Sequence, residues 1–560
     1  MKTNKLLPLL FSLLLSAMAF AQRVPLNTSL EAKFNQSPQE RIWTTLNNTV
    51  FFPSEYLYFN LYLMDEQTNK SSDLSTVAYI RLVDSKNNTA VIKRVTVEKG
   101  FAQGDLFIGA HLKTGSYTLQ AYTQWMLNRP TTSYQQEIYI INPYTNAKVT
   151  TNTSSNFNQS VDQRSSSTSL NFEVQLKDVY QQRDSIRIQI KPNKEAISKI
   201  PFSISVRKKE ELPHPIRNQE LQRVPTATEL SDSIWLPEHR GSTINAKITT
   251  DYFDTETALL TQAGSNGLIA SLASENPSEI KIASLELNTD FPVLIQDKNK
   301  LQYDQLIRFQ ALPSPKIDPL VSTYIPLNEQ HKKAVITRSV YNQIENNYFE
   351  FKPDSIPLKP NTTFFKTLQS VAFDLNQYTR FPTLKETFKE IIPEVTVNTI
   401  RGTDVVMIKQ IRIMPRFEHA LLMIDGIVFS NAQQLFEVPA TLIDKITIYT
   451  EAFVLGGKTY AGAIFMEGNN PNAPYLKTGI RVPESYLSDS PKSYFNQQHH
   501  TSNTLPDYRT QLYWNPKFIG DASKTILLYS SDVTGVFELR IQGINDDGIP
   551  LNFVKEFRVN

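Results

Sequence analysis

Cysteine is absent from this chain of 560 residues, and glycine and methionine are scarce, with 18 and 8 residues. Without thiols the protein cannot form disulfides, use thiol catalysis, hold a metal through thiolates or carry a lipid on an N-terminal cysteine. Tyrosine and phenylalanine, by contrast, number 24 and 31, and proline reaches 32. Aromatic residues favour strands, and prolines end strands at loops. The composition therefore predicts a mainly β protein that is held together by core packing alone.

A strong charge of either sign is also missing. The 57 lysines and arginines nearly balance the 55 aspartates and glutamates, which leaves a formal net charge of +2. Nucleic acid and anionic membrane surfaces attract proteins with a pronounced basic excess, so neither is expected as a partner. At roughly 150 residues per domain, the length predicts three to four domains with ample hydrophobic cores.

Catalytic and metal-binding signatures are lacking as well. The sequence contains no H-E-x-x-H zinc motif, no P-loop and no G-x-S-x-G nucleophile elbow. The histidines are scattered apart from His499 and His500, and neighbouring side chains of an extended segment point in opposite directions. Carboxylate pairs such as Glu386 and Glu390 become a hydrolase site only where they converge across a cleft. We therefore expect no enzyme activity, no metal and no cofactor.

The N-terminal 21 residues have the pattern of a cleavable secretory signal. Lys2 and Lys5 precede an apolar run at 6–15, and the small-residue site Ala19-Phe-Ala ends before Gln22. An uncleaved anchor is the alternative, but the apolar run is short for a membrane span. No later segment is apolar enough to cross a membrane. The sequence thus predicts an exported protein without a transmembrane span of its own.

Strand-like alternation, turn residues and polar stretches divide the chain. The predicted order is a signal peptide at 1–21, a β-sandwich at 22–143, a flexible linker at 144–170, a β-sandwich domain at 171–235, a second sandwich-like domain at 236–311, a helical connector at 312–380, a small α/β domain at 381–474, a loop at 475–504 and terminal β-strands at 505–560. The linker has a long surface loop as its alternative. The terminal strands either form a domain of their own or complete the edge of an earlier one.

The most informative stretch is 420–466. An apolar run ends at Asp425-Gly426, a pair that accepts the positive φ angles of a hairpin turn, and a short strand returns at 427–429. A short helix up to Pro439 and an alternating strand at 443–449 follow. The sequence predicts a compact α/β module in which Asp425 and Gly426 are a structural turn and not a site.

Two further patterns concern a helix and a set of aromatic residues. Residues 327–348 carry apolar side chains mostly four apart, which predicts an amphipathic helix with Ala334, Ile336, Val340, Ile344 and Tyr348 on its face. The aromatic residues Tyr56, Tyr58, Tyr62, Tyr117, Tyr122 and Trp125 lie on alternating strands. Such residues either line a ligand groove or fill a core, and we assign them to packing.

Three serines follow an aspartate and precede an isoleucine: Ser185, Ser233 and Ser355. This triplet resembles the O-glycosylation site of Bacteroidetes. The resemblance implies glycans at these serines and agrees with an exported protein.

The first β-sandwich carries a family resemblance. The segments at 52–55, 58–62 and 104–107, and above all T-G-x-Y-x-L-x-A-Y-T-x-W at 114–125, resemble the second macroglobulin-type domain (MG2) of the α2-macroglobulin superfamily. The resemblance implies an antiparallel sandwich, as the alternation does. True α2-macroglobulins trap proteases through a thioester between a cysteine and a glutamine, and this chain has no cysteine to form one.

The 420–466 stretch carries a second resemblance. Its pattern L-x-x-I-D-G-I, P-x-x-x-I-x-x-I-x-I and G-A-I resembles the plug domain of TonB-dependent outer-membrane receptors. The stretch after the module is too short for the many strands of a closed barrel. The sequence therefore predicts a plug-like module without its barrel.

Together, the two resemblances place the chain near exported Bacteroidetes proteins related to TonB-dependent receptors. We expect a non-enzymatic multidomain protein in the periplasm or at the outer membrane. Its expected function is that of an accessory or scaffold subunit of an outer-membrane β-barrel complex, for transport, secretion or barrel assembly. The alternative is a periplasmic or surface protein that binds glycans or peptides.

Overall fold

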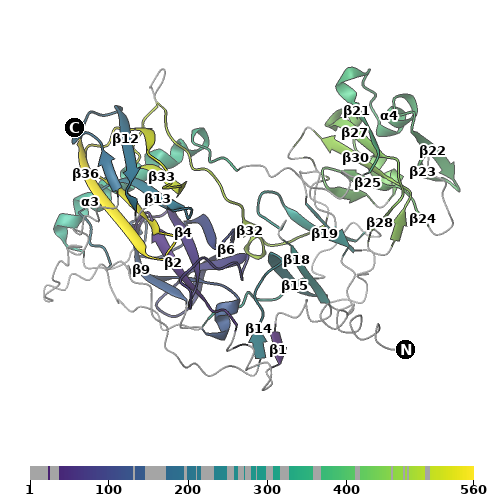
Figure 1. Cartoon of the computed structure of the whole chain (residues 1–560). Helices are drawn as coiled ribbons and strands as arrows, with labels where there is room; N and C mark the ends of the chain where they lie inside the picture. The colour runs from purple at the N-terminus through teal and green to yellow at the C-terminus, as the bar shows by residue number, and fades with distance from the viewer. Residues whose placement is uncertain are drawn as a thin grey trace. The chain divides into compact units, whose positions relative to one another are not determined.

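The computed structural model describes residues 23–25, 34, 37–129, 133–145, 172–194, 198–209, 211–215, 233–248, 258–262, 270–271, 279–284, 287–297, 307–315, 327–356, 368–409, 417–429, 431–455, 458–468, 470, 473, 475, 479–498 and 505–560. Contacts divide the chain into two compact units. Unit 1 comprises Met1–His239, Pro313–Pro357 and Ser488–Asn560, and unit 2 comprises Arg240–Leu312 and Leu358–Leu487. Both units consist mainly of strands in several sheets, so the predicted mainly β, multidomain fold class is confirmed (Figure 1).

Unit 1 begins with a β-sandwich. Its three-stranded sheet contains β2 (Glu40–Leu46), β4 (Tyr56–Asp65) and β7 (Phe101–Phe107), and its six-stranded sheet contains β3 (Val50–Phe51), β9 (Tyr134–Ile140), β8 (Gly115–Tyr122), β5 (Val77–Val83), β6 (Thr89–Thr96) and β32 (Ser488–Asp489). The inward-facing apolar side chains of both sheets form one core. This is the sandwich that the alternating pattern predicts, with one late strand, β32, added at its edge.

Strand β4 is buried on both faces because its two sets of alternating side chains meet different partners. Phe59, Leu61 and Leu63 enter the core of the first sandwich. On the opposite face, Asn60 donates a hydrogen bond to the carbonyl of Pro516 and the Tyr62 hydroxyl donates one to the carbonyl of Pro201, both over 2.9 Å. The first sandwich is therefore joined to the rest of unit 1 through this sheet.

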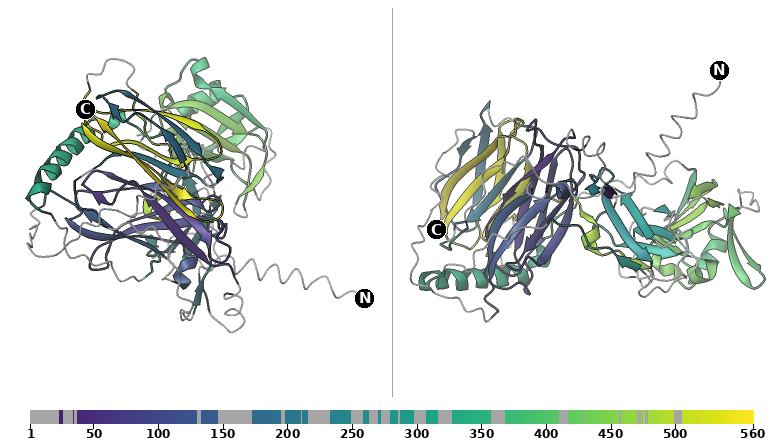
Figure 2. Two further views of the ribbon diagram at one scale, coloured as in Figure 1. Left: turned by 60° about the vertical axis from the view of Figure 1, so that its left-hand side comes forward. Right: turned by 90° about the horizontal axis from the view of Figure 1, so that it is seen from below.

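The second sandwich of unit 1 is assembled from two distant parts of the chain. One sheet contains β10 (Phe172–Gln175), β12 (Ser185–Pro192) and β34 (Lys524–Tyr529), and the other contains β11 (Val179–Tyr180), β36 (Pro550–Val559), β35 (Gly535–Ile544), β13 (Phe202–Lys208) and β33 (Gln511–Phe518). Figure 2 shows the yellow C-terminal strands lying beside the blue strands of the earlier segment. The structure thus differs from the predicted order: 171–235 does not form a sandwich alone, and 505–560 supplies half of its strands.

The two parts of this sandwich are also linked by an ion pair. Arg183 donates to both carboxylate oxygens of Asp532, over 2.6 and 2.7 Å, and Asp532 also accepts the backbone N–H of Asp507. The hydrogen bonds from Arg183 lower the pKa of Asp532, although partial burial acts in the opposite direction. Folding therefore favours the ionised form of Asp532 over the protonated form.

This pairing makes the stability of unit 1 depend on pH. Because Asp532 ionises at lower pH when folded, its contribution is complete above the ordinary aspartate pKa of 3.8 and is lost as the pH falls through the lower, folded value. We expect Asp532→Asn to lower the free energy of unfolding at neutral pH by about 1 kcal/mol, after allowance for solvent screening. The deficit should shrink at a pH below the ordinary aspartate value of 3.8. Urea unfolding at both pH values measures it, with the exposed Asp73→Asn as control; a deficit independent of pH would contradict the assignment.

Helix α3 (Glu329–Asn347) lies within the stretch predicted to be helical. Its cap is local: the Asn328 side chain accepts the backbone N–H of His331, and the His331 ring accepts the backbone N–H of Asn328. The predicted buried face is wrong, however, because Ile336 and Val340 are 55% and 47% exposed. The helix instead buries Arg338 and Ser339, and Ala334 and Val335 pack against an apolar cluster of the first sandwich.

Arg338 anchors that face. Its Nε and Nη2 atoms donate to the two carboxylate oxygens of Glu55 over 2.9 and 2.7 Å, and Nη2 also reaches the carbonyl of Val50. The guanidinium lies 4.5 Å from the centre of the Phe52 ring. This ion pair attaches α3 to the first sandwich, together with the apolar contacts of Ala334 and Val335.

Unit 2 contains two groups of strands. The first has β15 (Ser242–Ile248) between β18 (Glu279–Ser284) and β20 (Ile307–Phe309), and a second sheet of β17 (Ala270–Ser271), β16 (Ala258–Gln262), β19 (Val293–Asp297) and β31 (Ile480–Arg481). Apolar residues of both sheets share one core. Strand β31 lies in the stretch predicted as a loop, so this group also recruits a late segment.

The second group of unit 2 is an α/β module. Its sheet has the order β21 (Ser370–Asp374), β27 (Ile443–Tyr449), β30 (Ala463–Gly468), β25 (Leu421–Ile424) and β26 (Ile427–Phe429), and the helices α4 (Leu384–Glu390) and α5 (Ala432–Phe436) share its core. Strands β22 (Val395–Ile400) and β23 (Thr403–Ile408) form a separate hairpin, and β24 (Phe417–Glu418), β29 (Lys458–Tyr460) and β28 (Phe453–Leu455) form a small sheet. The module thus starts at β21, within the stretch predicted as a helical connector.

The Asp425-Gly426 pair forms the turn between β25 and β26, with φ angles of 47° and 80°. These positive values are those of a tight hairpin turn, where glycine carries no Cβ penalty. The Asp425 carboxylate accepts the N–H of Gly468 over 2.8 Å and the hydroxyl of Tyr475 over 2.9 Å. Burial, and then this hydrogen bond, raise the pKa of Tyr475. The Asp425 side chain therefore links the turn to the end of β30 by a hydrogen bond.

We expect Gly426→Ala to destabilise the α/β module by about 1–2 kcal/mol, because a Cβ is strained at this φ. Hydrogen exchange at residues 421–429 measures the loss. The control is Gly115→Ala, at a glycine without a positive φ where an added Cβ would meet only open space. Equal exchange in Gly426→Ala and the unsubstituted protein would contradict this role of the turn.

Some sequence predictions fall outside the described residues. They are the signal peptide at 1–21 and the greater part of the linker at 144–170. Among the residues that are described, no helix is long and apolar enough to cross a membrane.

Candidate binding site

A cavity of about 180 Å³ lies in unit 1, where five segments of the chain meet. Strand β4 and the loop before it form one wall, and α3 with the 3-10 helix η5 (Phe349–Phe351) forms another. The segments 494–495 and 508–514 close it. Since these segments are far apart in sequence, only the folded unit brings the lining side chains together.

Aromatic rings dominate the lining. Four of them form a row in which neighbours are nearly parallel: Phe349 and Tyr56 at 6.1 Å between centroids, Tyr56 and Tyr58 at 6.2 Å, and Tyr58 and Trp514 at 5.8 Å. Tyr56 and Tyr58 are two residues apart on β4 and therefore share a face of the strand. The Tyr494 ring meets Tyr58 edge-on at 4.7 Å. These four residues, Phe349, Tyr56, Tyr58 and Trp514, are called the aromatic row below; all four line the cavity.

Trp514 carries an unused hydrogen-bond donor. The residue is only 4% exposed, and its indole Nε1 has no hydrogen-bond partner within the described chain. A buried N–H without a partner costs free energy, so folded proteins rarely retain one. Among the described lining residues, Trp514 is the one with such a buried side-chain atom.

Charged groups at the rim are neutralised locally. Lys492 pairs with Asp105 over 2.5 Å and with Asp354 over 3.7 Å, so a cation lies between these two carboxylates. Burial raises the pKa of Asp354, and the nearby Asp105 adds to this effect, while the N–H of Phe495 and Lys492 oppose it. Asp105 and Asp354 therefore both face Lys492, and there is no open space between the two carboxylates for a substrate.

The other charged lining residues are paired as well. Arg338 pairs with Glu55, Lys352 with Glu345, and Arg509 with Asp507, whose two carboxylate oxygens each lie 2.7 Å from its guanidinium. Arg207 also has a partner. The walls of the cavity thus present charges whose partners are already in place.

The structure divides the aromatic residues that the sequence assigns to packing. Tyr62, Tyr117, Tyr122 and Trp125 are buried in apolar clusters, in agreement with that assignment. Tyr56 and Tyr58 also pack against aromatic rings, but in addition they line the cavity. The sequence reasoning also missed Phe349, Tyr494 and Trp514. The aromatic content of 505–516 is the one signal that could have indicated Trp514.

The predicted glycosylation serines lie in different places. Ser185 is exposed at the start of β12, and Ser233 begins β14 (Ser233–Trp235), opposite Pro25 of β1 (Arg23–Pro25). Ser355 is exposed and exchanges two backbone hydrogen bonds with Ser493. None of the three lines the cavity. Modification of these serines stays a prediction.

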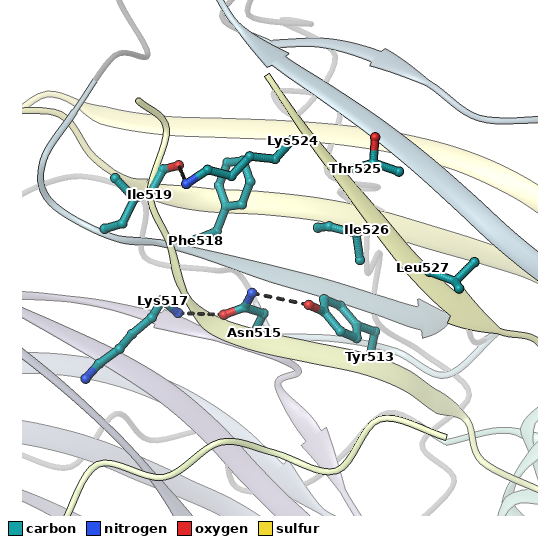
Figure 3. Close-up of a pocket in the computed structure, with 9 residues that line it drawn as sticks. All are labelled: Tyr513, Asn515, Lys517, Phe518, Ile519, Lys524, Thr525, Ile526 and Leu527. Carbon is teal, nitrogen blue, oxygen red and sulfur yellow. Dashed lines mark hydrogen bonds between the residues drawn. The ribbon is translucent and has the colours of Figure 1, made fainter. Parts of the chain in front are cut away.

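A second, shallower pocket of about 330 Å³ lies between the edge strands β33 and β34 of the second sandwich. Figure 3 shows its lining residues on these two strands and on the turn that joins them. Its polar groups bond one another: the amide of Asn515 donates to the Tyr513 hydroxyl, and Lys524 donates to the carbonyl of Ile519. This pocket lacks a buried unpartnered group among its described residues, so it is the weaker candidate.

Other chemical candidates do not form a site. In the described residues no three histidine, aspartate or glutamate side chains gather as a metal site would require. The hydroxyl of Thr49 lies 3.1 Å from Nδ1 of His214, but neither residue lines either pocket. His499 and His500 lie outside the described residues.

Comparisons with known proteins give only weak structural similarity. No protein-family model matches the chain, and no curated protein matches it. Among solved structures, it is similar to a Salmonella α2-macroglobulin reacted with methylamine, at 9% identity and a TM-score of 0.23 over 93% of this chain and 39% of that one. For trypsin-activated α2-macroglobulin from Escherichia coli the values are 7%, 0.23, 93% and 41%. A β-glucosidase from Listeria innocua matches over 19% of this chain and 17% of its own, at 13% identity and a TM-score of 0.14.

This chain therefore spans about two fifths of the length of the bacterial α2-macroglobulins that it matches. A likeness at these TM-scores carries no argument about function. The mainly β, multidomain class rests on the sheets themselves, and the cavity remains the feature from which a function can be argued.

Proposed function

We propose that this chain is an exported, non-enzymatic binding protein, and that the cavity of unit 1 holds a glycan or peptide ligand. The observation that carries the proposal is the row of aromatic residues that lines the cavity, from Phe349 through Tyr56 and Tyr58 to Trp514. Binding sites are typically aromatic-lined hollows with a few polar groups that fix the ligand.

The charges around the cavity favour binding over catalysis. A general acid and base work as groups that are free to exchange a proton with the substrate. Asp354 and Asp105 instead share Lys492, and Glu55 and Glu345 hold Arg338 and Lys352 in place. These pairs fix the walls of the cavity around a ligand.

Thermal-shift screening of the mature chain tests the proposal. We expect a saturable rise in the melting temperature with one ligand from panels of oligosaccharides and short peptides, since a ligand that binds only the folded state stabilises it. Fluorescence of tryptophan monitors the correct unit, because the four tryptophans, at 43, 125, 235 and 514, all belong to unit 1. No stabilisation by any member of either panel at millimolar concentration would contradict the proposal.

A second candidate function is favoured by the α/β module of unit 2. Its five-stranded sheet ends in β21, where the exposed side of the strand includes Val371. Ile400 and Val454 are exposed apolar residues of the two smaller sheets of the module. Unpaired sheet edges are sites where another chain can dock. We propose that this module is plug-like, and that it docks onto an outer-membrane β-barrel complex of a Bacteroidetes cell, from the periplasm or the outer membrane.

Cross-linking in the native envelope tests this second function. A cross-linker placed at Val371→Cys, in a chain that has no other cysteine, reports on β21 alone. We expect a defined barrel protein in the cross-linked product. A control cysteine at the exposed Lys332 of α3, in unit 1, should not yield it. The same product from both positions, or no barrel protein from either, would contradict docking through β21.

A further inference from the structure

We propose that residues 488–496, called the strap below, form a wall of the unit 1 cavity that opens and uncovers the aromatic row. The inference rests on the proposed binding function, since a wall that opens would admit the ligand and then retain it. Three observations support it: the position of the strap, the polar character of its attachments and a lysine that keeps one of its partners paired.

The strap runs from the edge of the first sandwich to the cavity. At its start, β32 lies parallel to β6. Farther along, Tyr494 and Phe495 line the cavity. The Tyr494 ring meets the Tyr58 ring of the aromatic row edge-on at 4.7 Å. Movement of the strap away from β4 would therefore uncover Tyr58.

The attachments of the strap are mainly polar. No residue of the strap belongs to the apolar clusters of the described chain. Its attachments are Asp489 to Lys93 over 2.6 Å, Lys492 to Asp105 over 2.5 Å, the Gln103 amide to the carbonyl of Lys492 over 2.6 Å, the N–H of Phe495 to Asp354 over 2.9 Å and the Asn496 amide to the carbonyl of Leu527 over 3.1 Å. Water can replace such partners when a segment opens, but it cannot replace apolar burial.

Apolar burial anchors the other walls of the cavity. Strand β4 places Phe59 in the core of the first sandwich, and Leu512 of the 508–514 segment lies in the core of the second. Val335 of α3 packs against a further apolar cluster. Segments with few buried apolar contacts open at a lower free-energy cost than core elements do. We therefore expect the strap to open while the other walls stay in place.

A second lysine lets the strap leave without isolating a buried carboxylate. The Asp105 side chain on β7 is 2% exposed, and a charge left unpaired there would make opening costly. Lys93 of β6 lies 3.6 Å from Asp105 and 2.6 Å from Asp489 of the strap. When the strap opens, Lys93 loses Asp489 but remains beside Asp105. Asp354, whose side chain is 29% exposed, can then be hydrated. The sandwich thus keeps an ion pair at Asp105 in both the closed and the open state.

Hydrogen exchange of the full mature chain in D2O tests the opening. The reporters are the amides of Ser493 and Phe495, whose acceptors lie outside the strap. We expect them to exchange faster than the amides of β4, and Lys492→Met to speed them about tenfold or more while β4 is unchanged. The control is Lys70→Met, at an exposed lysine of the first sandwich, which should leave both rates unchanged. Strap amides that exchange no faster than those of β4 would overturn the inference.

A disulfide at the strap gives a second test, which removes no ion pair. Ser355 and Ser493 are exposed and exchange two backbone hydrogen bonds, over 2.9 and 2.8 Å. The Cα atoms of such antiparallel pairs lie about 5.5 Å apart, within the range of about 4.4–6.8 Å that a disulfide spans. Because the chain has no other cysteine, Ser355→Cys with Ser493→Cys can form one bond within the chain, which holds the strap closed until it is reduced.

We expect the oxidised form to exchange the Phe495 amide about tenfold or more slowly than the reduced form. It should also associate more slowly with the glycan or peptide that the thermal-shift screen identifies. Unchanged exchange would overturn the inference. Slowed exchange with an unchanged association rate would overturn control of access and leave the proposed binding function standing. If neither panel yields a ligand, the proposed function fails, and the exchange rates alone decide whether the strap opens.

Discussion

Replacing Glu40 by alanine is expected to lower the free energy of unfolding of unit 1 by about 3 kcal/mol or more, because several buried donors lose their acceptor at once. Glu40 is 1% exposed, at the start of β2. Its carboxylate accepts hydrogen bonds from the hydroxyls of Ser72, Ser75 and Thr123 and from the backbone N–H of Ser75, over 2.7 to 3.1 Å. Three separate segments of the first sandwich therefore meet at this one side chain.

Urea unfolding followed by tryptophan fluorescence measures the loss, because all four tryptophans report on unit 1. The control is Glu556→Ala, which removes a carboxylate from a surface pair with Lys209 whose side chains are 47% and 55% exposed. Surface pairs of this kind contribute about 0–1 kcal/mol. A loss in Glu40→Ala that is no larger than in Glu556→Ala would show that the buried hydrogen bonds of Glu40 contribute little.

Arg338→Ala is expected to cost about 3–5 kcal/mol, the usual cost of breaking a buried ion pair from one side. The side chains of Arg338 and Glu55 are 5% and 13% exposed, so Glu55 would be left with little access to water. The variant would also lose the contact of the guanidinium with the Phe52 ring. Since this residue anchors α3, we expect hydrogen exchange along the helix to rise together with the loss of stability.

Lys332→Ala is the control for this helix. Lys332 is exposed and lies 3.9 Å from Glu329 one turn away, so its removal should change stability by less than about 0.5 kcal/mol. If Arg338→Ala left exchange in α3 unchanged, the apolar side chains of the helix, and not its ion pair, would be what holds it in place.

The sequence predicted those elements whose signals are local. Asp425 and Gly426 specify a turn through their own backbone preferences, and Leu384 and Phe388 are fully buried on α4 because they recur one turn apart. The alternation of apolar and polar residues in 505–560 predicted strands there. This alternation does not indicate with which other strand each of them pairs. The pairing of β33 and β35 with β13 is therefore visible only in the folded chain.

The face of α3 and the cavity could not be predicted for a related reason. Arg338 is a polar residue whose burial depends on Glu55, 283 positions earlier in the chain, so helical periodicity alone pointed to Ile336 and Val340 instead. The cavity likewise needs Tyr58 and Trp514 to approach each other from different sandwiches. The sequence shows that these aromatic residues are present, but only the folded chain shows that they lie together at the cavity.

Trp514 is expected to lie in a ligand site of unit 1. Indole ¹⁵N labelling of the four tryptophans gives four N–H cross-peaks, and the loss of one peak in Trp514→Phe assigns that residue. On titration with the glycan or peptide that the thermal-shift screen identifies, we expect the Trp514 peak to shift in proportion to saturation while the peaks of Trp43, Trp125 and Trp235 stay in place. Saturable binding that leaves the Trp514 peak unmoved, or that moves another indole peak instead, would contradict the account.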